Sequence, residues 1–457
     1  MQFDFSRLPF KNRAFSEKPM TFIDQPPKNF LAAIVDVIAL ETGSRVAREY
    51  WQRKQLQNLL EHATQSSAFW RGRVGTTNIK NIHLSDLPIL TRSAVIKQVQ
   101  SEGSLLPHNG TIPVTKHSTS GSSGTPVEFF VSAMNSQYNN VRSNAQYFIE
   151  GRDLTPNRTR LQSVRQSNKN GFTAKKTGSW LGPLGSFLKT GINKHIEYFH
   201  PNINLLLKEF ESDSIGYLIA PPRIVEMMFQ YMSPAVLKRA GMIMWIPLSE
   251  PVDPTLREQF ASLNIPVRAN YSSEEVGVIG FECEKYSGNY HVATSNVIIE
   301  VSKDDQINLL GDKQVGRVLV THLHSYATPF IRYDVGDVAS LADRCSCGHD
   351  GPTLSAVYGR SKGLLKHSDG RISTFYIPDY ALTTITKFDE YRIRQIDVKT
   401  IVVEIGGRGS LTSDEIAAFT KLIKRRAGGD FEVQVTPVSK IEWGHSIKRL
   451  GFRSEVL

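Results

Sequence analysis

The chain has 457 residues, of which 40% are hydrophobic and 21% are charged, and it contains 3 cysteines. This is ordinary globular composition, which excludes fibrous, disordered and disulfide-rich proteins, and the length excludes a single small module. Lys and Arg outnumber Asp and Glu by 54 to 44, a formal charge of +10, which favours anionic partners such as nucleotides, acidic carrier proteins or nucleic acids.

The N-terminal region shows neither a membrane span nor a secretory signal. The longest apolar run, residues 30–40, is interrupted by Asp36 and is shorter than the roughly 20 residues that a spanning helix needs. The first residues include an acid at Asp4 and have no apolar signal core. We therefore expect a cytoplasmic protein.

Helical and strand patterns then alternate along the chain. Residues 45–71 carry leucines at helical spacing, which predicts one core-facing helix. Thr91 is placed to cap a short helix. Further on, apolar runs at 214–220 and 241–248 alternate with helical stretches such as 222–232, the pattern of βα units around a largely parallel sheet.

The C-terminal half has a different pattern. Between residues 296 and 321, apolar runs are joined by polar residues and Gly, which predicts an antiparallel β subdomain. From about residue 364 the chain alternates strand, helix and strand, at 397–405, 411–427 and 431–438. This order is compatible with a separate α+β lobe.

Residues 154–196 contain no Asp or Glu. The basic residues of this stretch are Arg158, Arg160, Arg165, Lys169, Lys175, Lys176, Lys189 and Lys194. The polar loop expected at 167–179 would present positive charge to an incoming anionic acceptor. The alternative is an ordinary solvated loop, because charge runs usually face water.

A second unusual segment consists only of hydroxyl side chains and glycines. Its residues are Thr119, Ser120, Gly121, Ser122, Ser123, Gly124 and Thr125. Hydroxyls, amide N–H groups and the positive φ that Gly allows can wrap a polyphosphate. Pro126 and Val127 follow, so the segment lacks the Gly-Lys-Ser/Thr ending of a Walker A loop. A solvated Ser/Gly linker is the alternative.

This segment and four later ones stand in the order found in the adenylate-forming superfamily, and the chain resembles its phenylacetate-CoA ligase and CapK-like branch. The matching segments are TSGSSGTP, WIPLSEP, ANYSSEEVG, PFIRYDVGD, and CSCG followed by VYGRSKG. The resemblance implies an α/β fold: a large N-terminal α/β body with a β subdomain, residues 1–360, and a small mobile C-terminal α+β lobe, residues 361–457. The body would bind ATP and a carboxylic acid.

The resemblance also implies an activity. A small carboxylic acid is activated by ATP as an acyl-adenylate, and its acyl group passes to a thiol, that of coenzyme A. Transfer to an amine, a hydroxyl or a carrier protein, as in polysaccharide or natural-product biosynthesis, is the alternative. A catalytically silent nucleotide-binding scaffold also stays open. The implied cofactors are ATP, Mg²⁺, coenzyme A and structural Zn²⁺, and nucleic acid is not an implied partner.

For the nucleotide, the resemblance implies roles for residues of the ANYSSEEVG segment. Tyr271 would pack on adenine, and Glu275 would hold Mg²⁺ on the phosphates bound by residues 119–125. Ser272 and Glu274 depart from the family pattern, which leaves open whether Glu274 or Glu275 faces the metal. The alternative is that the two acids cap a helix N-terminus.

Three further residues take roles from the resemblance. Asp337 would accept both ribose hydroxyls, although a turn-forming Asp beside Gly is the alternative. Arg360 would contact the nucleotide at the hinge between body and lobe. Lys448 would swing in as the catalytic cation on the carboxylate and the α-phosphate. Lys440 or Arg449 could take its place, and an ordinary basic tail is the other alternative.

The three cysteines suit a metal better than a disulfide. Cys345 and Cys347 are separated by one residue, and Cys283 is followed eight residues later by His291. Three thiolates and an imidazole form a closed tetrahedral zinc set, and the phenylacetate-CoA ligase branch has a similar arrangement. Three reduced cysteines that behave as small buried apolar residues are the alternative.

Overall fold

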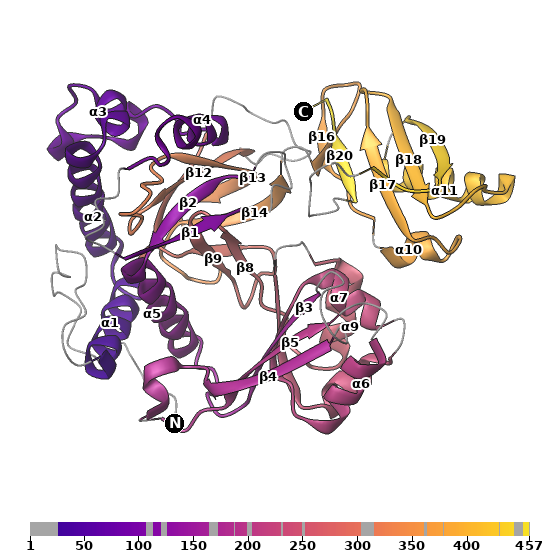
Figure 1. The fold of residues 1–457 in the computed structure, drawn as a ribbon, viewed down its shortest axis with the longest axis horizontal. Helices are drawn as coiled ribbons and strands as arrows, with labels where there is room; N and C mark the ends of the chain where they lie inside the picture. The colour runs from indigo at the N-terminus through magenta and orange to yellow at the C-terminus, as the bar shows by residue number, and fades with distance from the viewer. Residues whose placement is uncertain are drawn as a thin grey trace.

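The computed structural model describes residues 26–106, 113–119, 126–163, 172–186, 188–198, 203–229, 232–248, 252–302, 315–360, 363–377, 379–428, 430–442 and 451–456. Helices at the N-terminal side, a seven-stranded sheet and a five-stranded sheet form a large body, and a four-stranded sheet forms a lobe at the C-terminal side (Figure 1). The predicted α/β class with a C-terminal α+β lobe is confirmed.

The seven-stranded sheet carries most of the predicted site residues. Its order is β11-β12-β13-β14-β10-β9-β8 and every pairing is antiparallel, as the sequence predicted for this region. The strands are β8 (Asn270–Ser273), β9 (Gly277–Glu282), β10 (Tyr290–Val292), β11 (Val297–Val301), β12 (Val315–His322), β13 (Tyr333–Ala342) and β14 (Thr353–Arg360).

Helices α2, α3 and α4 contribute apolar side chains to the same core as this sheet. Their bounds are α2 (Arg45–Ser66), α3 (Ala68–Val74) and α4 (Arg92–Glu102). The single helix predicted over 45–71 is therefore wrong, because Ser67 is extended and its hydroxyl caps a new helix at the Trp70 amide. Thr91 caps α4 through the Ala94 amide at 3.2 Å, as predicted.

The five-stranded sheet has the order β4-β5-β3-β6-β7. Strands β5, β3, β6 and β7 are parallel, as predicted, and β4 pairs antiparallel at the edge. The strands are β3 (Arg158–Ser163), β4 (Phe172–Ser179), β5 (Ile192–Tyr198), β6 (Gly216–Ala220) and β7 (Met242–Pro247). The loop expected at 167–179 is wrong for its described part, because residues 172–179 form β4.

Helices bury both faces of this sheet. On one face α1 (Pro26–Glu41) packs with α5 (Ala133–Ile149) around Trp180 and Tyr217. On the other, apolar residues of α6 (Ile203–Ser212), α7 (Pro222–Met228), α8 (Pro234–Arg239) and α9 (Pro254–Ser262) surround Trp245. A hairpin of β1 (Val114–Ser118) and β2 (Glu128–Ser132) leads into α5. Among the described helices, none combines the length and apolar character needed to cross a membrane.

The C-terminal lobe has its own core. Its sheet has the order β19-β18-β17-β20, and the predicted strand-helix-strand unit is present as β18, α11 and β19. The elements are β15 (Leu364–Lys366), β16 (Ile372–Thr374), α10 (Asp379–Thr383), β17 (Glu390–Gln395), β18 (Thr400–Gly406), α11 (Ser413–Ala427), β19 (Glu432–Val438) and β20 (Phe452–Ser454). Leu364 packs with residues of the body, whereas Leu365 belongs to the core of the lobe.

Candidate functional site

Tyr271 and Asp337 meet although their strands are far apart in the sheet. The Tyr271 hydroxyl donates a hydrogen bond of 2.8 Å to Asp337 Oδ2. In a flat sheet, β8 and β13, separated by four strand spacings, would be about 19 Å apart. The sheet must therefore curl until β8 approaches β13. Both side chains are half-buried, so the pair faces a surface that a ligand can reach.

Arg92, the first residue of α4, connects two of the predicted motifs. One guanidinium nitrogen, Nη2, donates to Thr119 Oγ1 at 3.1 Å, and Nη1 lies 3.4 Å from Glu275 Oε1. Thr119 is held in turn by the Val127 amide at 2.9 Å. The start of the Ser/Gly segment and the acid of the ANYSSEEVG segment thus belong to one site.

The structure distinguishes the two neighbouring glutamates of that segment. Glu275 is 7% exposed, while Glu274 is exposed to solvent. The buried Tyr333 hydroxyl donates to Glu275 Oε1 at 3.1 Å, so both Arg92 and Tyr333 bind the same oxygen. The second oxygen, Oε2, receives neither of these bonds. Of the two candidates, Glu275 alone is built into the site.

The structure describes only some of the other residues that were predicted for the nucleotide site. Arg360 ends β14 and is the ladder partner of Asp337, so its backbone lies beside the Tyr271–Asp337 pair. Residues Ser120, Gly121, Ser122, Ser123, Gly124, Thr125 and Lys448 lie outside the described residues.

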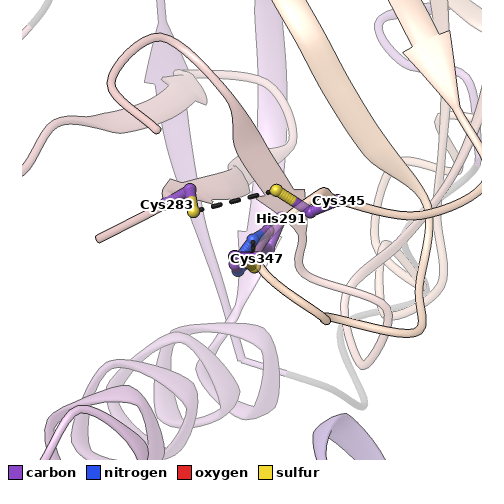
Figure 2. Close-up of side chains that lie close together, drawn as sticks. All are labelled: Cys283, His291, Cys345 and Cys347. Carbon is purple, nitrogen blue, oxygen red and sulfur yellow. Dashed lines mark hydrogen bonds between the residues drawn. The ribbon is translucent and has the colours of Figure 1, made fainter. Parts of the chain in front are cut away.

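Cys283, His291, Cys345 and Cys347 form one cluster (Figure 2), and their ligand atoms all lie within 4.8 Å of one another. The Cys283 and Cys345 sulfurs are 3.8 Å apart, and Cys347 Sγ is 3.3 Å from His291 Nε2. A tetrahedral zinc ion with Zn–S bonds of 2.3 Å separates its sulfurs by about 3.8 Å. The cluster therefore has the dimensions of a zinc site rather than of a disulfide.

The surrounding chain fixes the ligands of this cluster. The Cys283 amide donates to the Asn289 carbonyl at 2.7 Å. Glu282 receives the Gly288 amide at 2.9 Å and Arg257 at 2.8 Å, so the turn between β9 and β10 is clamped to α9. The His349 amide lies 3.4 Å from Cys347 Sγ. N–H groups directed at sulfur stabilise a thiolate, which is the form that binds a metal.

Burial sets the protonation of the cluster's imidazoles. It lowers the pKa of His291, and it lowers the pKa of the stacked His349 to about 4, helped by the neighbouring His291. Burial raises the pKa of the Cys347 thiol to about 11 while no cation is bound. A neutral imidazole is the ligand form. A cation in the middle would reverse the effect on the thiols.

The basic stretch is partly neutralised by acids from another segment. Lys194 is 1% exposed and binds Glu209 at 2.7 Å and Asp213 at 3.1 Å, while Lys176 binds Asp213 at 2.8 Å. Lys194 therefore forms ion pairs from a buried position, and Lys176 also has a carboxylate partner. Lys175 is exposed on the edge strand β4.

Sequence reasoning missed Arg92, Tyr333 and His349. A signal for Arg92 was available, because a cation at the first position of a helix opposes the helix dipole and no acid lies in the first turn of α4. A cation at this position therefore indicates an interaction partner outside the helix. Tyr333 lies within the PFIRYDVGD segment but follows ordinary strand alternation, which gives no hint of its bond to Glu275.

No family model and no curated protein sequence matches the chain. Among solved structures it is similar to 2-hydroxyisobutyryl-CoA ligase in the postadenylation state with 2-HIB-AMP, with a TM-score of 0.63 and 16% identity over 91% of each chain. The same ligase with 2-HIB-AMP and CoA in the thioesterification state gives 0.55 and 17%, over 91% of this chain and 92% of that one. The acyl acid amido synthetase GH3.15 gives 0.50 and 12%, over 91% of each. The chain therefore shares the fold of these acyl-CoA ligase and amido synthetase structures, an α/β fold of the kind that its motif order predicted.

Proposed function

We propose that this protein is an ATP-dependent, AMP-forming carboxylate ligase that transfers the activated acyl group to the thiol of coenzyme A. The observation that carries the proposal is the position of Arg92, which contacts Thr119 of the Ser/Gly segment and Glu275 of the ANYSSEEVG segment. Because hydroxyl and amide groups suit a phosphate and a buried carboxylate suits a hard cation, this contact supports a phosphate site between Thr119 and Glu275. The fold shared with a ligase that holds an acyl-AMP supports the proposal.

The nucleoside would bind at the curled edge of the seven-stranded sheet. Tyr271 offers a half-buried aromatic ring and Asp337 an acceptor carboxylate, and the bond of 2.8 Å between them holds the two groups together. In the proposed complex the ring packs on adenine and the carboxylate accepts the ribose hydroxyls. Arg360 is the proposed contact at the junction with the C-terminal lobe.

The phosphates would bind between residues 119–125 and Glu275. Arg92 and Tyr333 hold Oε1 of Glu275, which fixes the carboxylate and leaves Oε2 as the oxygen for a hard cation. Mg²⁺, when bound there, neutralises charge on the triphosphate. Arg92 is a positioning residue in this scheme, because it connects the acid to the phosphate-binding segment.

The proposed reaction has two displacement steps. An oxygen of the substrate carboxylate attacks the α-phosphorus of ATP, and the bond to pyrophosphate breaks. The coenzyme A sulfur then attacks the acyl carbon, the bond to AMP breaks, and the thiol proton is released to solvent. No covalent enzyme intermediate is needed, so the chain contributes orientation and charge neutralisation.

Lys448 is the proposed mobile cation of the first step. The chain on both sides of it is fixed: the Ile441 amide donates to Glu390 Oε1 at 2.8 Å, and the Gly451 carbonyl accepts from Ile393 at 2.9 Å. The described residues before and after the segment that carries Lys448 therefore both lie beside β17. We expect Lys448→Ala to slow adenylation by about 100-fold or more and to spare thioester formation from a supplied acyl-adenylate.

Lys440→Ala is the matched control for that experiment, because Lys440 is exposed and precedes the same segment. Loss of adenylation in the Lys440 variant alone would move the role to Lys440. Equal losses in both half-reactions of the Lys448 variant would indicate a damaged lobe instead.

We further propose that residues 361–457 move as a unit relative to the body. Leu364 packs with the body and Leu365 with the lobe, so the junction is short. The Tyr376 hydroxyl donates to Glu226 of α7 at 2.9 Å, and α10 contacts α7. The higher TM-score to the postadenylation state than to the thioesterification state supports an arrangement of lobe and body like the former.

The cysteine–histidine cluster is proposed to hold a structural zinc ion. Its four ligands leave no open coordination position, and the nucleotide-site residues come from other segments. Zinc, when bound, would cross-link the β9–β10 turn to the turn after β13. It takes no part in the proposed chemistry.

The function is tested by ATP–pyrophosphate exchange with a panel of carboxylic acids. Exchange that depends on one acid establishes adenylation, and Lys448→Ala, with its expected loss of about 100-fold or more, provides the inactive control. Adding coenzyme A, then amines or a carrier protein, identifies the acceptor; the similarity to an amido synthetase makes amines the second choice. Absence of exchange with every acid, in protein that binds ATP, would support the silent scaffold.

A further inference from the structure

Arg48, Arg142 and Lys194 are the buried Lys and Arg residues in the described part of the body, and of these only Lys194 forms salt bridges with carboxylates there. Lys194 binds Glu209 and Asp213 at 2.7 and 3.1 Å. Arg142, on α5, is 2% exposed, and its guanidinium donates one hydrogen bond, from Nη1 to the neutral Asn139 Oδ1 at 2.9 Å. Its Nε and Nη2 have no partner among the described residues. Burial lowers the pKa of Arg142 to about 10, so it stays charged at neutral pH.

Two buried histidines, whose ring centroids are 6.5 Å apart, are also incompletely bonded. His322 is 1% exposed, and neither ring nitrogen has a partner within the described chain. His324 uses Nε2 on the Ser295 carbonyl at 2.9 Å, stacks on Tyr138 at 4.0 Å and leaves Nδ1 without a partner among described residues. Burial first, and then the charge of Arg142, lower the pKa of His324 to about 3. Tyr138 lies four residues before Arg142 on α5, so the His324 ring that stacks on it is on the same face of the helix as Arg142.

Glu41 forms no direct bond with Arg142 in the described part of the protein. Glu41, at the end of α1, acts on Arg142 through its charge. Its oxygens are already occupied, Oε2 by Thr294 Oγ1 at 2.6 Å and Oε1 by the Ser295 amide at 2.7 Å. In the described part of the protein, no salt bridge joins the two residues. Burying a cation without a close counter-charge is strongly unfavourable.

Electrostatics favours an anion over water at this position. Water would satisfy the orphaned N–H groups of Arg142 and His322 but would bring no charge. An anion would supply both the acceptor and the missing charge. The ligand must also be small, because the side chains that would hold it are between 0 and 2% exposed.

We propose that Arg142 and His322 hold one small monovalent anion of the size of chloride in the interior of the body. The site lies behind the turn that carries Glu275: a Cβ on Gly277 would be 3.2 Å from Asn139 Oδ1. Asn296 donates to the carbonyls on both sides of Gly277, those of Val276 at 3.0 Å and Val278 at 2.6 Å. The anion is a structural ligand and does not depend on the proposed ligase activity.

The test is thermal unfolding of the full chain in sodium chloride, sodium bromide and sodium gluconate at one ionic strength. Chloride and bromide should raise the midpoint by about 2 to 4 °C relative to gluconate. Arg142→Met, which keeps the length of the side chain and removes the charge, should abolish this difference. Lys194→Met, a buried cation that has its own carboxylates, should retain it.

A second measurement keeps the test decisive if Arg142→Met does not fold. Wild-type crystals soaked in bromide should give an anomalous peak in contact with Arg142 and His322. Ordered water at that position, or a chloride response of the same size in wild type and Arg142→Met, would overturn the proposal. Loss of the ligase activity in any assay would not bear on it.

Discussion

The proposed nucleotide site and the cysteine–histidine cluster are built on the same seven-stranded sheet in opposite ways. In the proposed nucleotide site, Tyr271 bonds Asp337 and Arg92 bonds Glu275. In the cluster, the ligand atoms of four residues lie within 4.8 Å of one another, with Cys345 Sγ 3.8 Å from Cys283 Sγ and Cys347 Sγ 3.3 Å from His291 Nε2. The first site consists of paired oxygen and nitrogen groups, whereas the second gathers three thiols and an imidazole, the ligand types of a structural zinc site.

The two sites therefore differ in the interactions that stabilise them. Removing one member of a pair in the proposed nucleotide site leaves its partner unsatisfied, which costs about 1 to 3 kcal/mol of stability at a buried group, and it also removes a proposed ligand contact. The thiols of the cluster would repel each other as thiolates unless a cation lies among them. We therefore expect mutations in the cluster to act mainly on stability, and mutations in the proposed nucleotide site to act mainly on the reaction, with a smaller loss of stability.

The largest expected effect is loss of the ion from the cluster. Cys345→Ser removes one of four ligands, and we expect the unfolding midpoint to fall by about 10 °C while activity per folded molecule changes little. Ser346→Ala, between the two cysteines, is the control and should match wild type. About one equivalent of zinc per wild-type chain should be found by metal analysis. Metal-free protein of unchanged stability would contradict the zinc assignment.

The next effect is expected at Glu275. Glu275→Gln keeps the shape of the side chain but removes the charge that would hold Mg²⁺, and we expect adenylation to fall by about 100-fold, or about 2.7 kcal/mol in the barrier. Glu274→Gln, at an exposed position, should change the rate less than twofold. A magnesium titration of both variants checks the cause, because only the Glu275 variant should need more metal. The reverse ranking would give the metal to Glu274.

A smaller and graded effect is expected at the Tyr271–Asp337 pair. Asp337→Ala removes the proposed ribose acceptor and should raise the KM for ATP by about 10-fold or more. Tyr271→Phe keeps the ring for adenine and removes the hydroxyl that bonds Asp337, so its KM should rise by about threefold. Because the pair is half-buried, both variants should unfold within a few degrees of the wild-type temperature. If Tyr271→Phe is the more damaging change, the ring is not the part of Tyr271 that matters.

Sequence patterns predicted much of the fold because local signals and tertiary packing agreed. The strand-helix-strand order of the lobe and the cap at Thr91 are examples. The break at Ser67 was missed because the leucine spacing runs across it, while a single hydroxyl decides where the second helix starts. Strand β4 was read as a loop, because an exposed edge strand with lysines and glycine has no apolar face to reveal it.

Sequence reasoning identified candidate residues whose type and motif indicate a chemical role. It missed residues whose role depends on tertiary contacts. Glu275 and the four members of the cluster have distinctive types and spacing. Tyr333 and Arg142 do not, because their roles depend on which segments fold against them. Arg142 in particular lies on α5, yet its neighbours His322 and His324 are far along the chain. Only the assembled structure brings such groups together.

The smallest effect is expected far from both sites, at the contact between lobe and body. Tyr376→Phe removes the hydroxyl that donates to Glu226, which is 8% exposed. Because Tyr376 is 37% exposed, the lost bond should shift the balance between lobe arrangements by only about 1 kcal/mol, or roughly fivefold. Zinc content and ATP binding should stay at wild-type values.

Measuring the two half-reactions separately shows which lobe arrangement the Tyr376→Phe variant favours. If the present arrangement serves adenylation, Tyr376→Phe should slow ATP–pyrophosphate exchange a few-fold and leave thioester formation from a supplied acyl-adenylate unchanged or faster. Tyr286→Phe, which alters an exposed tyrosine of the body, is the control and should change neither rate. A loss confined to thioester formation would mean that the Tyr376–Glu226 contact belongs to the second step, and the order of lobe positions proposed for this protein would have to be reversed.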